Sequence, residues 1–289
     1  MEIGVVYPQI ELGGSPDAVR SIVRATEDLG FDYLLAYDHV LGAVHEGREP
    51  PLLGPYTQHD PFHDPLVLFA YAAGLTTRIG FATGILILPQ RQTALVARQV
   101  ADLDVLSGGR LRLGVGVGWN YVEYDALGQD FATRGAREEE QIELLRRLWT
   151  EPVVTFDGRF DQVDRAGTLP MPTRPVPIWM GGFGAAAFKR AARIADGFMF
   201  GGRTDQVIAS WNEMRDDVSA NGRSVDDFGG ELIAFTTKGP EQLAVRIGEW
   251  RDAGGTHASV NTMGHGFITV AQHVDYLASV ADAVGLRST

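Results

Sequence analysis

The sequence predicts an α/β protein whose core is an eight-stranded parallel (β/α) barrel. Short apolar runs alternate eight times with segments of helical period, the pattern of a parallel sheet covered by helices. The length, 289 residues, is near the roughly 250 residues typical of such a barrel. An open, doubly wound sheet gives the same alternation and is the alternative. We expect one domain, residues 1–289, with its site at the carboxyl ends of the strands.

The first four strand–helix units occupy the N-terminal half of the chain. Their strands are expected at Ile3–Tyr7, Tyr33–Ala36, Ile79–Leu88 and Leu111–Val117. Ser15 and Asp64 each precede a proline, and a capping side chain followed by proline marks the start of a helix. Two further helices are expected at Ala94–Leu106, ended by Gly108-Gly109, and near Ala136–Trp149.

Two segments interrupt the alternation. The stretch Leu41–Phe62 is rich in Gly and Pro and is too long for a strand-to-helix turn. Loops of this size are usually lids, binding loops or disordered segments. Residues Val153–Phe160 predict a hairpin that turns on Asp157-Gly158, a preferred pair for a type I′ turn.

The C-terminal half supplies the other four units. Their strands are expected at Val176–Met180, Gly197–Gly201, Leu232–Thr236 and Ala258–Val260. Their helices are expected at Ala185–Ala195, Gln206–Ala220, Glu241–Ala253 and Val270–Val284. Thr269 and Gln272 have the spacing of a capping box at the start of the last helix.

The composition disfavours several classes of protein. The formal net charge is −12 and no long Lys/Arg run occurs, so we expect neither a nucleic acid nor an anionic membrane as partner. No cysteine is present, which excludes disulfides, thiolate nucleophiles and Cys-ligated metal sites. No apolar stretch is long enough to cross a bilayer, and no basic and apolar leader stands before Ile3. We therefore expect a cytoplasmic protein.

Tyr37-Asp38-His39 follow the second strand and place a carboxylate and an imidazole at the barrel mouth. Histidine can donate or accept a proton near neutral pH, and a neighbouring Asp favours its cationic form. Asp38 and His39 are therefore the candidate catalytic residues. A hydrogen-bonded loop histidine without catalytic function is the equally open alternative.

Glycine recurs at every second position where the fourth strand ends, at Gly114, Gly116 and Gly118, followed by Trp119-Asn120. A strand face without side chains lets a flat ligand lie against the backbone, whereas tight packing inside the barrel is the alternative. The spacing differs from a dinucleotide fingerprint, and we expect no helix directly after it. A Rossmann site is therefore disfavoured.

Strand five ends in Met180-Gly181-Gly182-Phe183-Gly184 and runs directly into a helix. Glycines before a helix N-terminus leave backbone N–H groups free to converge on an anion. We favour a phosphate site here, with a ligand-free glycine turn as the alternative. Because the protein is acidic, positive potential at the mouth has to come from helix termini and from arginines such as Arg91 or Arg203.

The remaining histidines and acidic residues give no metal prediction. His59-Asp60 and His63-Asp64 are four residues apart, but Pro61 and Pro65 interrupt any helix that would place them on one face. His257 and His265 are isolated candidates. In the fourth helix we interpret the acidic residues as a solvated face, namely Glu138, Glu139, Glu140 and Glu143.

Together these segments resemble the bacterial luciferase-like monooxygenase superfamily, in particular its branch of oxidoreductases that use the deazaflavin coenzyme F-420. The resemblance covers nearly the whole chain. It is carried by Leu29-Gly30-Phe31-Asp32, Asp38-His39, Leu103–Leu111, Gly114–Asn120, Ile178–Gly182 and Ala195-Asp196-Gly197.

The resemblance implies a barrel that binds a deazaflavin or flavin at the carboxyl ends of its strands. Asp38 and His39 would lie beside the ring, Gly116 and Gly118 along the chain of the cofactor, and Gly181-Gly182 at its phosphate. A non-prolyl cis peptide of the family maps to Gly84-Ile85. The full set of expected cofactor-binding residues is Asp38, His39, Gly84, Ile85, Gly116, Gly118, Trp119, Asn120, Met180, Gly181, Gly182 and Phe183. Sugar-phosphate dehydrogenases of the family carry a catalytic Glu where this sequence has Trp119, which makes a sugar-phosphate substrate doubtful.

Three functions are compatible with this resemblance. The first is hydride transfer between coenzyme F-420 and a small organic substrate, with His39 as proton partner. The second is an FMN-dependent monooxygenase on the same barrel, and the third is a non-catalytic flavin-binding protein. A homodimer is the expected assembly.

Overall fold

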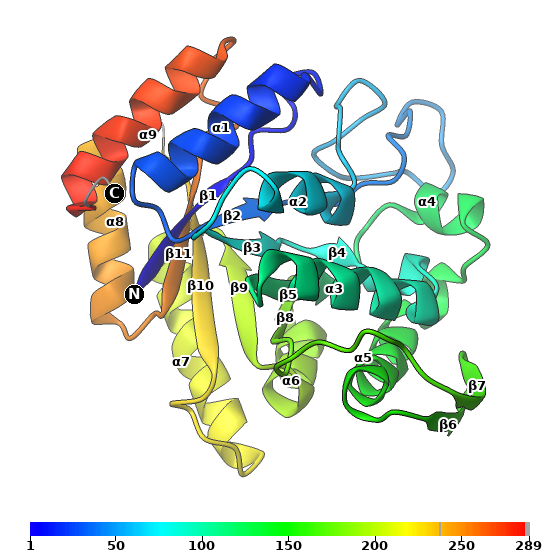
Figure 1. The fold of residues 1–289 in the computed structure, drawn as a ribbon. Coiled ribbons are helices and arrows are strands. Elements are labelled where there is room, and N and C mark those ends of the chain that lie inside the picture. Colours follow the sequence, from blue (N-terminus) through cyan, green and yellow to red (C-terminus); the bar gives the residue numbers. More distant parts are fainter. Residues whose placement is uncertain (237, 287–289) are drawn as a thin grey trace.

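The structure is a computed structural model that describes residues 1–236 and 238–286. Its main sheet is ordered β3-β2-β1-β11-β10-β9-β8-β5-β4, and β3 also pairs with β5. The pairing of β3 with β5 closes the sheet into a barrel, and β3 and β4 are two halves of one strand. With β3 and β4 counted as one interrupted strand, the sheet is the eight-stranded parallel barrel that the sequence predicts. The alternative, an open doubly wound sheet, is wrong. Figure 1 shows the helices arranged around the outside of the strands.

Most elements lie within a few residues of their expected positions. The strands of the barrel are β1 (Glu2–Val6), β2 (Tyr33–Ala36), β3 (Gly80–Thr83), β4 (Leu86–Ile87), β5 (Leu111–Gly116), β8 (Ile178–Gly181), β9 (Gly197–Gly201), β10 (Gly229–Ala234) and β11 (His257–Asn261). The helices around it are α1 (Pro16–Asp28), α2 (Pro65–Ala73), α3 (Thr93–Ser107), α5 (Arg134–Thr150), α6 (Ala185–Ile194), α7 (Thr204–Ala220), α8 (Pro240–Asp252) and α9 (Val270–Val284).

Local capping signals account for this agreement. The side chains of Ser15 and Asp64 accept backbone N–H groups at the starts of α1 and α2. The capping box of Thr269 and Gln272 opens α9, and Gly108 ends α3 in the left-handed conformation that favours glycine. Each of these helix ends was predicted from the sequence.

The third strand is broken where the resemblance places a cis peptide. Strand β3 ends at Thr83, the Gly84-Ile85 bond is cis, and β4 resumes at Leu86. Both halves pair with β5, through Phe81 opposite Leu111 and Leu86 opposite Val115. The predicted cis bond is confirmed, and the break is located at the carboxyl end of the barrel, where the strand approaches Asp38.

A short helix, α4 (Tyr121–Ala126), follows β5 almost at once. The Asn120 side chain caps it by accepting the N–H of Val122 at 3.2 Å. The expectation that no helix directly follows the glycine strand is therefore wrong. Helix α4 and the short η2 (Phe131–Thr133) fill the segment that the sequence indicates as irregular.

The predicted hairpin is present but longer than expected, with strands β6 (Val154–Asp157) and β7 (Gln162–Ala166). Its turn is not the two-residue Asp157-Gly158 turn, because Gly158 donates its N–H to the carbonyl of Asp161 at 2.9 Å. The carboxylate of Glu140 on α5 accepts the N–H groups of Arg159, Phe160 and Asp161. These tertiary hydrogen bonds fix a wider turn than the local sequence predicts.

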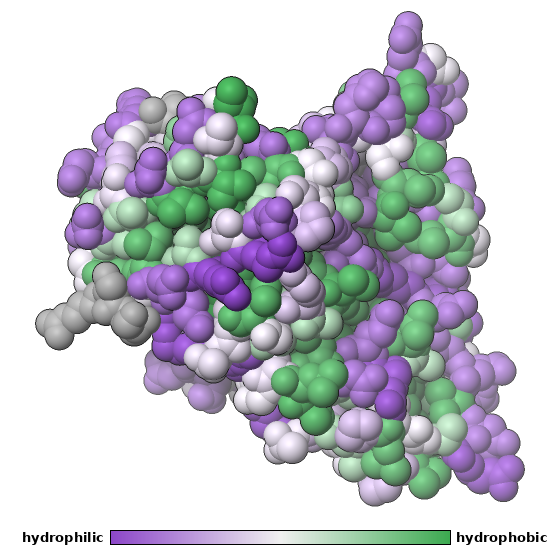
Figure 2. Space-filling view, turned by 45° about the horizontal axis from the view of Figure 1, so that its top comes forward, coloured by the Kyte–Doolittle hydropathy of each residue, from purple (hydrophilic) through white to green (hydrophobic). Residues whose placement is uncertain are grey.

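Within the described residues, no helix combines the length and the apolar character needed to cross a bilayer. Figure 2 shows hydrophobic side chains in separate patches among hydrophilic ones on one face of the molecule.

Candidate active site

A cavity of about 480 Å³ opens at the carboxyl ends of the barrel strands. Asp38 and His39 reach it from the loop after β2, Gly118 and Trp119 from the loop after β5, and Gly182 from the turn after β8. The residues that line it are Tyr37, Asp38, His39, Tyr56, Gly84, Ile85, Ile87, Val117, Gly118, Trp119, Arg134, Gly181, Gly182, Phe183, Met199, Gly201 and Ile233. Most of the expected site residues thus meet here. Gly116, Asn120 and Met180 lie outside this lining.

His39 is held by a carboxylate that is distant in the sequence. Its Nδ1 lies 3.2 Å from Oε1 of Glu123 on α4, whose side chain is almost fully buried. The same oxygen accepts the N–H groups of Val40 and Leu41 at 2.8 and 3.0 Å, and Oε2 accepts from Gln90 at 3.1 Å. Burial acts to raise the pKa of Glu123, but the hydrogen bonds from His39, Leu41 and Gln90 outweigh it and lower the pKa. Glu123 is therefore an anion at neutral pH.

Aromatic rings enclose His39 on its other sides. The rings of Phe62, Tyr56 and Trp119 lie edge-on to the imidazole at centroid distances of 4.9, 5.3 and 5.5 Å. Tyr56 and Phe62 belong to the long loop, residues 41–62, and also contact each other. The loop that the sequence indicates as a lid or binding loop therefore forms one wall of the site.

Helix α4 and its cap fix this loop in place. The Asn120 side chain donates to the carbonyl of Leu41 at 3.2 Å, and the Tyr121 hydroxyl donates to the carbonyl of Pro50 at 2.7 Å. Gly54 packs so closely on the Trp119 ring that a Cβ there would lie 2.3 Å from it. The expected ligand residue Asn120 thus serves the loop and the helix cap.

Asp38 does not pair with His39, contrary to the expectation from their adjacency. One of its oxygens accepts the N–H of Ile87 at 2.9 Å and the other pairs with Arg91 at 2.7 Å. Burial raises the pKa of Asp38 above its ordinary value, against the opposing effect of Arg91 and the Ile87 N–H. Arg91 also pairs with Asp64 at 2.9 Å. Asp38 therefore fastens the strand after the cis bond to the loop after β2.

Two glycines of the fourth-strand pattern are packed against protein. A Cβ at Gly114 would lie 2.0 Å from the Thr83 carbonyl oxygen, and one at Gly116 would lie 2.3 Å from the Ile85 side chain. Gly181 faces Ile85 from the other side, where a Cβ would lie 2.8 Å away. The interpretation that bare backbone at Gly114 and Gly116 offers a ligand surface is therefore wrong. Glycine leaves room at Gly116 for the side chain of Ile85, and Ile85 itself lines the cavity.

The glycine turn after β8 leads into helix α6 as predicted. Gly182 and Gly184 have φ angles of 151° and 86°, which favour glycine. In the described part of the chain, the N–H groups of Gly182, Phe183 and Gly184 donate to no carbonyl oxygen. Free N–H groups at a helix N-terminus suit an anion, so the turn keeps the chemistry expected of a phosphate site.

Arg134 supplies the cation of the lining, a role for which the sequence suggested Arg91 or Arg203. Arg91 forms ion pairs with Asp38 and Asp64, and the exposed Arg203 forms one with Asp205. Arg134 lies over the Phe131 ring at 3.7 Å and lines the cavity. Its neighbour Gly135 abuts Arg190 on α6, the helix that follows the glycine turn.

The other candidate side chains lie elsewhere. Among the described residues no group of three or more His, Asp or Glu is arranged to hold a metal ion. His59 is exposed, and Asp60 accepts the N–H and hydroxyl of Thr57. His63 lies beside Tyr7. His257 pairs with Glu2 at the opposite end of the barrel, and His265 packs on Phe235 after β11.

Glu138 is not part of a solvated face, which corrects the interpretation from the sequence. Its side chain is fully buried and pairs with Arg190 on α6 at 3.2 Å. Burial raises its pKa to about 8, although Arg190 acts to lower it. Glu139, its neighbour, pairs with Arg190 and Arg193.

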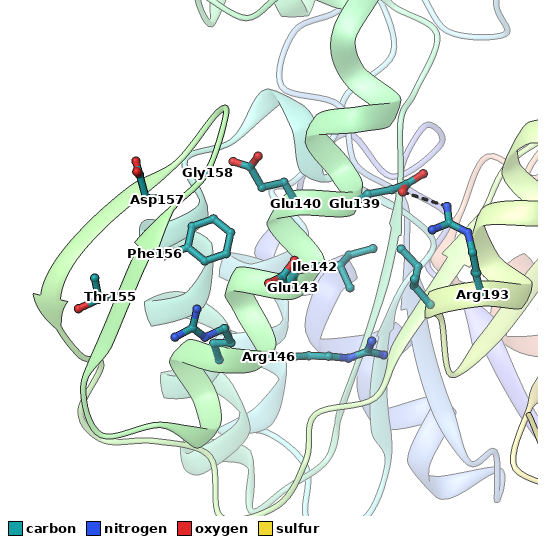
Figure 3. A pocket seen from close by; sticks show the side chains of 12 residues that line it. Glu139, Glu140, Ile142, Glu143, Arg146, Thr155, Phe156, Asp157, Gly158 and Arg193 are labelled. Carbon is teal, nitrogen blue, oxygen red and sulfur yellow. Dashed lines mark hydrogen bonds and ion pairs between the residues drawn. The ribbon is translucent and has the colours of Figure 1, made fainter.

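A second, larger cavity of about 850 Å³ lies outside the barrel, between α5, the β6–β7 hairpin and the end of α6. Figure 3 shows acidic and basic side chains around it, with Glu139 bonded to Arg193. Arg146 and Arg147 pair with Asp196 and Glu151, and Glu140 holds the hairpin turn. These charges are used in holding the hairpin and helices together, so the cavity at the strand ends is the candidate active site.

Glu123, Arg134 and Tyr56 were not among the site residues expected from the sequence. Glu123 and Arg134 lie in a segment expected to be irregular, and Tyr56 lies within a long loop. The only local signal was Asn120 before Tyr121-Val122-Glu123, an N-cap followed by an acidic first turn.

Comparison with known proteins identifies relatives of the chain by family, by sequence and by structure. The luciferase-like monooxygenase family model matches residues 1–237. An uncharacterised protein of Mycobacterium bovis is 41% identical over 161 residues, 54% of this chain and 56% of the relative. The chain thus matches little more than half the length of that relative.

Two further similarities extend over more of the chain. An F420-dependent glucose-6-phosphate dehydrogenase of Nakamurella multipartita is 31% identical over 221 residues, 73% of this chain and 61% of that protein. The solved structure of an F420-dependent secondary alcohol dehydrogenase in complex with an F420–acetone adduct has the same fold. Its TM-score is 0.80, with 18% identity over 98% of both chains.

Proposed function

Because this chain belongs to the luciferase-like monooxygenase family, we propose that it is an oxidoreductase that transfers a hydride between coenzyme F-420 and a small organic substrate. The observation that carries the proposal is the His39–Glu123 pair in the wall of a cavity at the carboxyl ends of the strands. A buried carboxylate behind an imidazole fixes the orientation of the ring. An imidazole oriented in this way can act as a general acid and base.

The lining suits a planar ring with an anionic tail. Ile85, Ile87, Met199 and Ile233 provide an apolar cleft, and Ile85 is seated by Gly116 and Gly181. The free N–H groups after Gly181 and the guanidinium of Arg134 suit the anionic part. We propose that Asp38, His39, Gly84, Ile85, Gly118, Trp119, Gly181, Gly182 and Phe183 contact the cofactor, with Gly116, Asn120 and Met180 behind them.

The bound deazaflavin supplies the hydride acceptor or donor. In the proposed reaction, His39 accepts or donates the proton. His39 presents Nδ1 to Glu123, so its Nε2 is the nitrogen that can face the substrate. When an alcohol is oxidised, its hydroxyl oxygen gives up a proton to Nε2 while a hydride leaves the carbon that bears this oxygen. In the reverse direction Nε2 returns the proton to the carbonyl oxygen. Asp38 holds the cis segment through Ile87 and takes no proton in this scheme.

Titration of the purified protein with F-420 and, separately, with FMN tests the cofactor. We expect F-420 to bind and to be reduced or oxidised in the presence of substrate, as followed by its absorbance. Tight FMN binding with no F-420 binding favours the FMN-dependent monooxygenase. Binding without turnover of any substrate favours the flavin-binding protein, and binding of neither compound refutes all three functions.

We further propose a homodimer. Val67 and Tyr71 on α2 and Leu95 on α3 are exposed apolar side chains on adjacent helices, a surface that an assembly would cover. Light scattering of the purified protein measures the mass directly. A monomeric mass at micromolar concentration contradicts the proposal.

A further inference from the structure

We infer that the substrate is a small, uncharged carbonyl compound or the corresponding alcohol, and that Trp119 is the residue that limits its size. This inference rests on the proposed function and specifies its substrate class. Three features of the cavity support it, namely its size, the aromatic wall around His39 and the cation Arg134 among the described lining residues.

The size of the cavity limits the substrate. Its volume of about 480 Å³ falls in the lower part of the roughly 300–1,000 Å³ that ligand pockets span. The cofactor ring and the substrate have to share this space. Trp119 lines it beside His39, and Gly54 of the long loop packs closely against the indole ring. Tyr121 and Asn120 anchor the same loop, so Trp119 is held in place from behind.

The wall around His39 is apolar and aromatic. Tyr56, Phe62 and Trp119 surround the imidazole, and the contacts are ring to ring. The two carboxylates nearby are already bound by protein groups. Asp38 accepts hydrogen bonds from Arg91 and from the Ile87 N–H. Glu123 interacts with His39, Val40, Leu41 and Gln90. A charged substrate group here would lose its hydration without gaining an ionic partner.

Arg134 is the cationic side chain of the lining, and it packs on the Phe131 ring. Arg134 stands at the start of α5, next to Gly135, which abuts Arg190 of α6. Helix α6 begins directly after the Gly181-Gly182 turn, so Arg134 and the free N–H groups serve the same, phosphate-binding side. The charge distribution therefore separates an anionic ligand part near α6 from an uncharged one near His39.

A matched pair of carbonyl compounds tests the inference by binding. Calorimetric titration of the F-420-loaded protein with butanone and with pyruvate compares an ethyl group with a carboxylate on the same methyl ketone. We expect butanone to bind at least about tenfold more tightly than pyruvate, and glucose 6-phosphate not to bind. Equal affinities, a preference for pyruvate, or no binding of butanone overturns the substrate class. The cofactor titration is read separately, so failure of F-420 to bind identifies failure of the proposed function instead.

Two substitutions at one position test the role of Trp119. We expect Trp119→Ala to admit acetophenone, a larger neutral ketone, with at least about tenfold higher affinity than the unchanged protein. We expect Trp119→Lys to reverse the preference between butanone and pyruvate, because it places a cation on the wall near His39. Thermal unfolding shows whether each variant is folded, and every ketone titration is made at an F-420 concentration that saturates the variant, because Trp119 is itself proposed to contact the cofactor. An intact Trp119→Ala protein with unchanged affinity for both ketones contradicts the assignment.

Discussion

The Nδ1 atom of His39 lies 3.2 Å from Oε1 of Glu123, a carboxylate oxygen that also accepts the N–H groups of Val40 and Leu41. One buried group therefore orients the imidazole and fixes the first residues of the long loop that covers it. Orientation of the proposed base and closure of the site depend on the same side chain. Changes at Glu123 should affect both, and variants that alter charge or shape separately can distinguish the two effects.

Glu123→Gln removes the charge and keeps the shape. The amide oxygen can still accept from Val40 and Leu41, so the loop should stay in place. The imidazolium formed during alcohol oxidation loses its anionic partner, and we expect kcat to fall by about tenfold to a hundredfold, part of the 10²–10⁴ that acid–base assistance provides. F-420 affinity should stay within about twofold. Steady-state kinetics with butan-2-ol, the alcohol that corresponds to butanone, and a fluorescence titration with F-420 measure the two quantities.

Glu123→Ala is the companion variant. It removes the acceptor of Val40 and Leu41 as well as the charge. Limited proteolysis should then cut the 41–62 loop faster than in Glu123→Gln. Equal proteolysis of the two variants would show that the loop does not depend on this carboxylate.

His39→Ala tests the proton transfer itself. We expect turnover to fall by about 10²–10⁴-fold, because the neighbouring carboxylate of Asp38 is held by Arg91 and the Ile87 N–H. Burial raises the pKa of Tyr56 to about 12, so its phenol is a poor substitute. Cofactor affinity should be roughly retained. Undiminished turnover in a protein that binds F-420 normally removes His39 from the mechanism.

Local sequence signals predicted the barrel well because they report on single elements. Helix α9 has its predicted bounds, Val270–Val284, since Thr269 and Gln272 cap its start and Gly285 its end. Glu123 was missed because its partner His39 is 84 residues away and no periodicity records such a contact. Glu138 was misinterpreted for the same reason, because the helix that buries it, with Arg190, lies 52 residues further on. Contacts between distant segments decide the site, and one sequence does not show them.

Asp38→Asn tests the fastening of the broken strand. Asp38 is buried and paired with Arg91, and removing one partner of such a pair costs about 3–5 kcal/mol. Arg91 keeps Asp64 at 2.9 Å, so we expect the lower end of this range. Urea unfolding measures the loss, with Asp164→Asn as the control. Asp164 pairs with Arg165 on the surface, and its loss should leave the unfolding free energy almost unchanged. Similar losses in the two variants would contradict a structural role for the buried pair.

A pair of glycine substitutions tests the packing of the barrel. Gly114→Ala places a Cβ 2.0 Å from the Thr83 carbonyl oxygen, which the sheet holds in position. We expect a loss of about 1–3 kcal/mol or more. Gly248→Ala lies within α8, where a Cβ meets nothing within 4 Å, and should stabilise the protein by about 0.5–1 kcal/mol. Thermal unfolding should shift in opposite directions, and a stabilising Gly114→Ala contradicts the packing.

His273 on α9 should make the protein acid-sensitive. It is fully buried, its Nδ1 lies 2.8 Å from the Thr262 hydroxyl, and burial lowers its pKa from 6.5 to about 4. As the pH falls from 6.5 to 4, the unfolded chain takes up a proton that the folded protein refuses, so the free energy of unfolding decreases. The full contribution is about 3 kcal/mol, present above pH 6.5 and lost at about pH 4. His273→Asn removes this group, so the wild-type protein should lose more stability than the variant between pH 7 and pH 5 in urea titrations. Because groups away from His273 titrate equally in both proteins, the difference reports on this site, and parallel pH dependences would show that His273 is not protected from protonation.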